Sequence, residues 1–100
     1  MFMIELKKEG VDRYRFDLKT HEGHVLLKSV EFPNKKVATN TIKELGGLDN
    51  TIERKTNYDG KFLFNLKNHV GELIGHSQLY NSEAGMENAI KNTKKVLGLL

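Results

Sequence analysis

The four histidines are the residues of this 100-residue sequence best suited to metal binding or acid–base catalysis. His21 and His69 hold equivalent places in two similar stretches, each in a short turn between predicted strands. Imidazole is a common metal ligand, so two such turns meeting on a symmetry axis would form a metal site. Neither histidine has Cys, Asp or Glu at a recognised ligand spacing. Polar turn residues are therefore the favoured interpretation, and a metal site or small enzyme using His21 and His69 is the weaker alternative.

The serines are the candidate nucleophiles, because His76 directly precedes Ser77 and Ser29 is its equivalent in the first stretch. Adjacent strand residues point to opposite faces of a sheet, so His76 and Ser77 cannot form a working dyad. Neither serine lies in a glycine-rich elbow, and no phosphate-binding loop is present. We expect both serines to form hydrogen bonds at a strand end, and we expect neither catalysis nor a cofactor.

Asn40 and Asn88 occupy the same place in the middle of two predicted helices. Asparagine is a mediocre helix former, so its recurrence at this place calls for a structural role. We expect each side chain to hydrogen-bond a backbone group of the sheet or of a connecting segment. The alternative is a paired polar site near a symmetry axis.

Basic residues on one strand face form the last candidate site, a surface for nucleic acid. This possible binding face comprises Arg13, Arg15, Lys19, Lys61 and Lys67. Sheets that bind nucleic acid usually mix exposed aromatic rings with such charges, whereas here the aromatic residues fall on the opposite face. Asp17 also dilutes the charge. We expect a solvated face, with weak nucleic-acid binding as an alternative that a salt titration would decide.

A repeated unit positions these candidates. Residues 4–45 align without a gap on residues 52–93, at an offset of 48 positions. The identical pairs include Phe16 with Phe64, Ser29 with Ser77, and Asn40 with Asn88. A match of this length indicates an internal duplication.

Each copy predicts three strands followed by a helix. Tyr14, Phe16 and Leu18 alternate with charged residues, which is typical of a half-buried strand. Helices are predicted after the N-cap residues Asn34 and Ser82. The predicted strands cover residues 3–8, 13–20, 24–31, 51–56, 61–68 and 72–79. This order is an α+β pattern rather than alternating strands and helices.

The size of one copy determines the expected architecture. A single unit buries too little apolar area to fold comfortably alone. We therefore expect one domain over residues 1–100, made of two repeats at 2–47 and 50–97. The copies would share one antiparallel sheet with pseudo-two-fold symmetry and both helices packed on one face. An uncovered edge strand invites dimerisation, so both a monomer and a homodimer fit the pattern.

Composition is that of an ordinary soluble globular protein, with 38% hydrophobic and 29% charged residues. The net charge of +3 is smaller than a dedicated nucleic-acid binder usually carries. No apolar run approaches the roughly 20 residues of a membrane span, and no secretory signal is visible. Cysteine is absent, so we expect a cytoplasmic protein without disulfides or thiolate chemistry.

The second copy carries a specific pattern that the first copy follows more loosely. In the second copy the pattern consists of residues 61–67 and 71–74, Ser77, Tyr80, Gly85, Asn88, Ile90, Lys91 and Lys94. In the first copy it consists of Tyr14, Phe16, Leu18, Lys19, Gly23, Ser29, Asn40 and Ile42. This pattern resembles the YegP-like family, a small bacterial domain of uncharacterised function that occurs singly or as tandem pairs.

The resemblance implies units of three strands, a helix and a further strand, joined in one sheet with their C-terminal strands exchanged. Two features depart from that plan. Residues 98–100 alone follow the second predicted helix, and Val37 stands where the second copy has Gly85. Since packing, turns or sheet hydrogen bonds explain the shared residues, we expect a non-catalytic binding or interaction module. Its partner would be another protein or a second copy of the chain.

Overall fold

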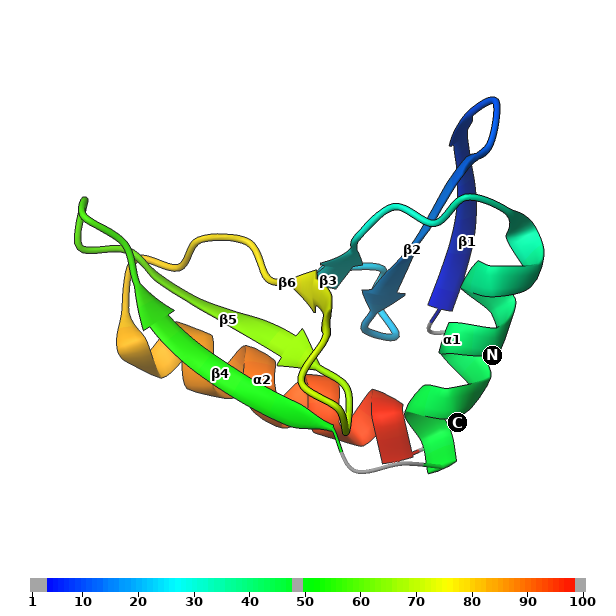
Figure 1. Cartoon of the computed structure of the whole chain (residues 1–100). Coiled ribbons are helices and arrows are strands. Elements are labelled where there is room, and N and C mark those ends of the chain that lie inside the picture. The colour runs from blue at the N-terminus through cyan, green and yellow to red at the C-terminus, as the bar shows by residue number, and fades with distance from the viewer. Residues whose placement is uncertain (1–3, 48–49, 99–100) are drawn as a thin grey trace.

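The computed structural model describes residues 4–47 and 50–98, which form one six-stranded sheet and two helices (Figure 1). The elements are β1 (Ile4–Gly10), β2 (Arg13–Lys19), β3 (Val25–Ser29), α1 (Lys35–Gly47), β4 (Thr51–Thr56), β5 (Phe62–Lys67), β6 (Leu73–His76) and α2 (Glu83–Gly98). The strand order is β1-β2-β3-β6-β5-β4, and all neighbouring strands are antiparallel. The three strands before α1 and the three after it therefore form two halves that meet at β3 and β6.

The alternating residues of β2 divide between the two faces of the sheet as predicted. Phe16 and Leu18 are fully buried, whereas Arg15 and Lys19 lie on the opposite face and are half-buried. The predicted N-caps are also confirmed. Asn34 Oδ1 accepts a hydrogen bond from an amide of the first turn of α1 at 2.9 Å, and Ser82 Oγ does so for α2 at 3.0 Å.

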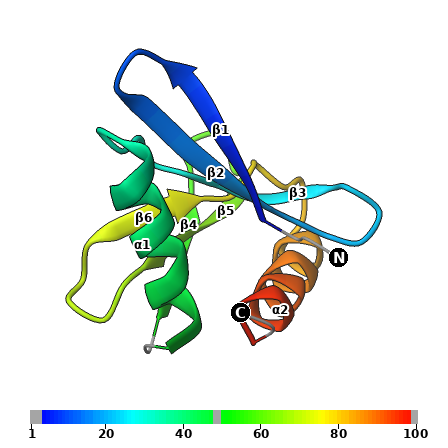
Figure 2. The same cartoon turned by 90° about the vertical axis from the view of Figure 1, so that its right-hand side faces the viewer.

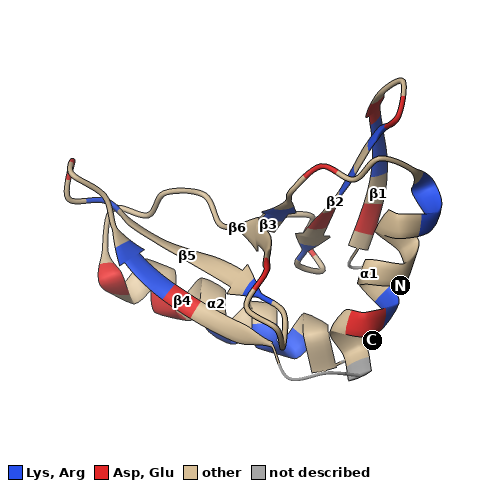
Figure 3. Ribbon diagram, in the orientation of Figure 1, with Lys and Arg blue, Asp and Glu red and all other residues tan. Residues whose placement is uncertain are grey.

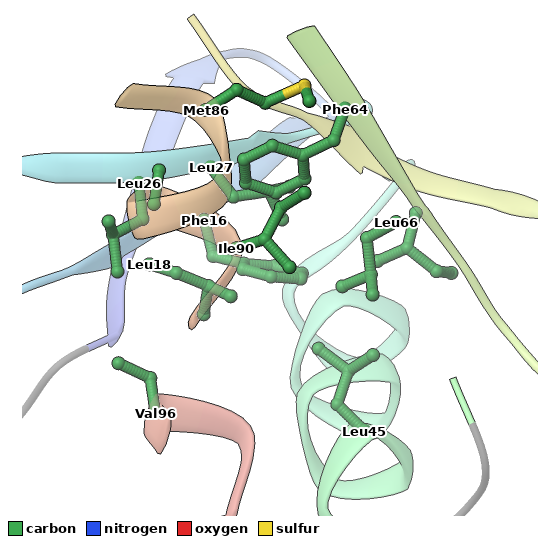
Figure 4. Packing of buried hydrophobic residues seen from close by; sticks show 12 residues of the cluster. Phe16, Leu18, Leu26, Leu27, Leu45, Phe64, Leu66, Met86, Ile90 and Val96 are labelled. Carbon is green, nitrogen blue, oxygen red and sulfur yellow. The ribbon is translucent and has the colours of Figure 1, made fainter. Parts of the chain in front are cut away.

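Both helices lie on the same side of the bent sheet (Figures 1 and 2). Buried side chains from the sheet and from both helices belong to one hydrophobic cluster, in which Phe16, Phe64 and Ile90 lie close together (Figure 4). Leu45 of α1 and Val96 of α2 join this cluster from the two helices. The α+β architecture is therefore confirmed, with one antiparallel sheet and two helices around a single core.

The junction of the two halves is short and tightly packed. Lys28 lies opposite His76 and Ser29 opposite Gly75. A Cβ atom on Gly75 would lie 2.5 Å from the carbonyl oxygen of Lys28 and 2.9 Å from Cδ2 of Leu27. Leu27 is fully buried and occupies the position that aligns with Gly75 at the 48-residue offset. Only glycine leaves room for the neighbouring strand and this leucine together.

One expectation about the strands is wrong. The third strand of each copy is shorter than predicted, because β3 ends at Ser29 and β6 ends at His76. Beyond them, isolated bridges join Tyr14 with Phe32 and Phe62 with Tyr80. The strand that follows α1, β4, pairs with β5 and so lies in the half of the sheet opposite to the three strands before that helix. A strand after α2 would lie outside the described residues. Among these residues, no helix is long and apolar enough to cross a membrane.

Candidate functional site

The outer face of the sheet, which is the face turned away from the helices, carries a row of polar residues across all six strands. Residues paired in register lie side by side on one face. The row runs in strand order through Glu5, Asp17, Lys28, His76, Asn65 and Glu53. Positive and negative residues are interspersed along β1, β2 and β4 (Figure 3). The outer face is therefore a mixed surface with no large area of one charge.

Asp17 is the centre of an ion-pair network on this face. Its side chain is only 1% exposed, contrary to the expected solvated face. Arg15 Nη1 donates to Asp17 Oδ1, and Lys7 Nζ lies 3.1 Å from Asp17 Oδ2 without forming an aligned hydrogen bond. This close contact with the Asp17 carboxylate, together with its negative charge, raises the pKa of Lys7. Because Lys7 also approaches Glu5 at 3.6 Å, it offsets the repulsion between Glu5 and Asp17 on adjacent strands.

The five basic residues of the possible binding face do not form a free positive surface. Each lies against an acidic or amide side chain. The pairs are Arg13 with Glu31 (3.7 Å), Arg15 with Glu9, Lys19 with Glu5 (2.6 Å), Lys61 with Asn81, and Lys67 with Glu53 (3.1 Å). The pKa values of Glu5 and Glu53 are lowered by their hydrogen bonds to Lys19 and Lys67. A polyanion would have to compete with these internal partners.

The turn histidines lie too far apart to share a metal ion. His21 is in the β2–β3 turn and His69 in the β5–β6 turn. Because β3 and β6 run antiparallel, these turns lie at opposite ends of the sheet. Both side chains are exposed. Within the described residues, no three histidine, aspartate or glutamate side chains gather as metal ligands.

The two shared serines form matching hydrogen bonds where β3 and β6 end. Ser29 Oγ accepts from the amide of Phe16 at 2.8 Å and donates to the carbonyl of Val30 at 2.7 Å. Ser77 Oγ accepts from the amide of Phe64 at 2.9 Å and donates to the carbonyl of the next residue at 2.8 Å. Both hydroxyls are therefore fully engaged with the backbone of the sheet, and neither is poised as a nucleophile.

The shared asparagines do not have the structural role that their recurrence suggested. Asn40 and Asn88 are exposed on the outer sides of α1 and α2. Neither side chain reaches the sheet, so neither holds a helix to it. The expectation is wrong because recurrence in a sequence does not determine which side of a helix faces the core. The two exposed amides also lie on different helices and form no shared polar site.

An apolar groove of about 320 Å³ lies beside α1, and we call it the α1 groove. It lies between α1, the segment that precedes it, and the β5–β6 turn. Its apolar lining consists of Val30, Phe32, Val37, Leu45, Leu73 and Ile74. Phe32 stacks on the buried ring of Phe16, with ring centroids 5.9 Å apart. The apolar floor of the groove is therefore continuous with the hydrophobic core.

Polar side chains stand around this apolar floor. Asn50 Nδ2 donates to the carbonyl of Leu45 at 2.9 Å, and Asn68 Nδ2 donates to Glu72 Oε1 at 3.0 Å. Of the residues that the structure describes, Glu44 and Glu72 are the charged ones that line the groove. Neither carboxylate has a cation partner within residues 4–47 and 50–98. In contrast, the acidic residues of the outer face are paired with Lys or Arg.

A second groove, of about 360 Å³, lies beside the C-terminal half of α2. Its position matches that of the α1 groove, because Thr20 and Leu26 align with Asn68 and Ile74 at the 48-residue offset. Its lining is more polar and includes His21, Glu22 and Lys95. Sequence reasoning missed both grooves. Val37, a large residue aligned with Gly85, was the visible signal for the first.

The chain matches known proteins over most of its length. A domain of unknown function (DUF1508) matches residues 57–96. UPF0339 protein YegP of Escherichia coli strain K12 is 32% identical over 94 residues, which cover 91% of this chain and 86% of that protein. The chain belongs to the UPF0339 family. Another member, the UPF0339 protein in the ptx operon 5' region of Stutzerimonas stutzeri, is 32% identical and covered to 85%.

Solved structures of UPF0339 members share this fold. The solution NMR structure of YegP from E. coli has a TM-score of 0.81 and 31% sequence identity, and the match covers 95% of this chain and 84% of that chain. The solution NMR structure of SO3888 from Shewanella oneidensis has a TM-score of 0.83 and 30% identity, with 94% and 82% covered. The YegP-like resemblance is thus confirmed. The family is of unknown function, and nothing in it indicates catalysis.

Proposed function

We propose that the chain is a non-catalytic interaction module made of two tandem units, residues 2–47 and 50–97, in one pseudo-two-fold symmetric domain. Hydrogen bonds that recur 48 positions apart support the duplication. They include the serine contacts at Phe16 and Phe64, the two isolated bridges and the two N-caps. Together the units provide the core that one of them would lack.

The α1 groove is the proposed binding surface. The observation that supports this proposal is that α1 has fewer buried side chains than α2. In α2, five residues spread along the whole helix are buried. In α1, only Ala38 and Leu45 are buried among the described side chains, and Val37 remains 39% exposed. Leu73, across the groove, is 42% exposed. An exposed apolar surface that continues into the core is typical of a protein interaction site.

The partner is proposed to be another polypeptide in the cytoplasm, a compartment in keeping with the cysteine-free sequence. The volume of about 320 Å³ lies at the lower end of the range for small-molecule sites, about 300–1,000 Å³. Val37 and Leu73 are exposed parts of the groove lining, and Val70 in the adjoining turn, which is 65% exposed, extends the apolar surface beyond the groove. A polypeptide segment covers such an extended surface better than a small molecule does.

Selection from a phage-displayed random peptide library tests this function. The library is panned on the wild type, on Leu73→Glu and on Leu79→Glu. Leu79 is a matched control because it is exposed, lies outside the groove and aligns with Glu31 in the first unit. Peptides are expected to be enriched on the wild type and on Leu79→Glu but not on Leu73→Glu. The thermal unfolding midpoint of Leu73→Glu is expected to equal that of the wild type. No enrichment, or equal enrichment on all three proteins, would refute the α1 groove as the binding surface.

A further inference from the structure

We infer that the α1 groove selects a polypeptide segment in which apolar side chains stand beside a lysine or arginine. This inference rests on the proposed function and specifies the chemistry of the partner. The apolar floor provides the affinity for apolar side chains, because burying them removes their surface from water. The charged residues at the groove determine which apolar segments fit.

Glu44 and Glu72 give the groove its charge preference. They enter it from opposite sides, Glu44 from α1 and Glu72 from the β5–β6 turn. No lysine or arginine of residues 4–47 or 50–98 lines the groove. Because both carboxylates lack a cation partner in the described part of the chain, a bound lysine or arginine gains an ion pair without breaking an existing one. A segment with an acidic residue at the same place meets like charge.

The combination of two unpaired carboxylates with an exposed apolar floor makes this arrangement informative. The protein carries a net charge of +3, so its overall field repels a basic partner. Of the ten acidic residues that the structure describes outside the groove, six are paired with Lys or Arg (Glu5, Glu9, Asp17, Glu31, Glu53 and Glu87), whereas Asp12, Glu22, Asp59 and Glu83 are not. A basic segment therefore finds unpaired carboxylates beside an exposed apolar floor at the α1 groove.

The second groove differs in charge and in exposed apolar surface, which are the two features that support this inference. Lys95 and His21 line it together with a single acidic residue, Glu22. Its apolar residues, Leu26 and Val96, are both buried. It therefore offers less exposed apolar surface and no excess of negative charge, and we expect the basic apolar segment to bind at the α1 groove alone.

Charge substitutions at the groove test the inference. One peptide selected on the wild type is compared with its counterpart carrying glutamate in place of each lysine and arginine, by fluorescence anisotropy. The variant Glu44→Gln/Glu72→Gln keeps an amide oxygen for Asn68 Nδ2 and is expected to bind the basic peptide about 2- to 30-fold more weakly, the range for two surface ion pairs. The variant Glu44→Lys/Glu72→Lys is expected to prefer the acidic counterpart.

The control removes the same charge elsewhere. Glu22→Gln/Asp59→Asn neutralises two exposed carboxylates outside the groove and is expected to bind the basic peptide within about twofold of the wild type. Equal losses in both neutralised variants, or selected peptides without lysine or arginine, would overturn the inference while leaving the groove as a peptide site. Failure of any peptide to bind would overturn the proposed function itself. If the purified chain self-associates and Leu73→Glu abolishes this self-association, the groove binds a second copy of the chain rather than a foreign segment. That result would also overturn the inference.

Discussion

The amide of Phe16 donates a hydrogen bond of 2.8 Å to the hydroxyl of Ser29, and this contact recurs between Phe64 and Ser77 at 2.9 Å. In each half, the serine replaces a main-chain acceptor where the third strand leaves the ladder. The phenylalanine is fully buried in both halves, so water cannot replace the hydroxyl. Ser29 and Ser77 thus each provide the hydrogen-bond acceptor for a buried amide at the equivalent place in the two halves.

Removing either serine hydroxyl is expected to destabilise the protein to a similar extent. Ser29→Ala and Ser77→Ala each leave a buried amide without its acceptor, which costs about 1–3 kcal/mol of unfolding free energy. Chemical denaturation of the two variants, monitored by circular dichroism, measures the loss. A loss of stability in one variant only would show that the two contacts are not equivalent. It would count against the proposal that the chain consists of two duplicated units.

The junction between β3 and β6 is expected to reject any side chain at residue 75. Gly75→Ala would place a methyl group 2.5 Å from the carbonyl oxygen of Lys28, so strand β6 must move. Overpacking of this kind costs about 1–3 kcal/mol. Gly98→Ala is the control, since an added Cβ there meets nothing within 4 Å. An unchanged unfolding midpoint for Gly75→Ala would contradict the close approach of the two halves.

Acid is expected to weaken the link between β4 and α2. Arg54 Nε and Nη2 donate to Glu87 Oε2 and Oε1 at 2.6 and 2.9 Å, and these hydrogen bonds lower the pKa of Glu87 from its ordinary value of 4.5. A lowered folded-state pKa stabilises the fold at neutral pH, and that stabilisation is lost as pH falls below about 4.5 through the folded-state value.

A pH series on Glu87→Gln measures this contribution. The difference in unfolding free energy between the wild type and Glu87→Gln is expected to be largest above pH 4.5 and to vanish at lower pH. Glu22→Gln removes a carboxylate that has no cation partner in the described residues and is the control for lost charge. A difference that persists unchanged into strong acid would show that the ion pair is not its source.

Much of the fold could be predicted because its signals are local. The alternation around Phe16 and Leu18 determines which face of β2 is buried, and Asn34 and Ser82 mark the helix starts through their capping side chains. The 48-residue offset also identified Ser29 and Ser77 as residues at strand ends. Each of these features depends on neighbours a few residues away or on direct comparison of the two similar stretches of sequence.

The rest depends on packing between distant segments, which local patterns do not specify. Asp17 falls on the polar side of an alternating strand, yet Arg15 and Lys7 fold over it and bury it. Leu27 and Gly75 align at the 48-residue offset but differ because they meet at the junction. The α1 groove was missed for the same reason, since it depends on how closely α1 packs against the half that follows it.

Mapping a selected peptide onto the protein by NMR tests the central claim most directly. Proton–nitrogen correlation spectra of the nitrogen-labelled wild type are recorded during titration with a peptide selected on it. The account predicts the largest amide shifts at Val37, Thr41 and Leu73, which line the α1 groove. Largest shifts at Thr20 and Asn92 beside α2, or on the outer face of the sheet, would contradict it.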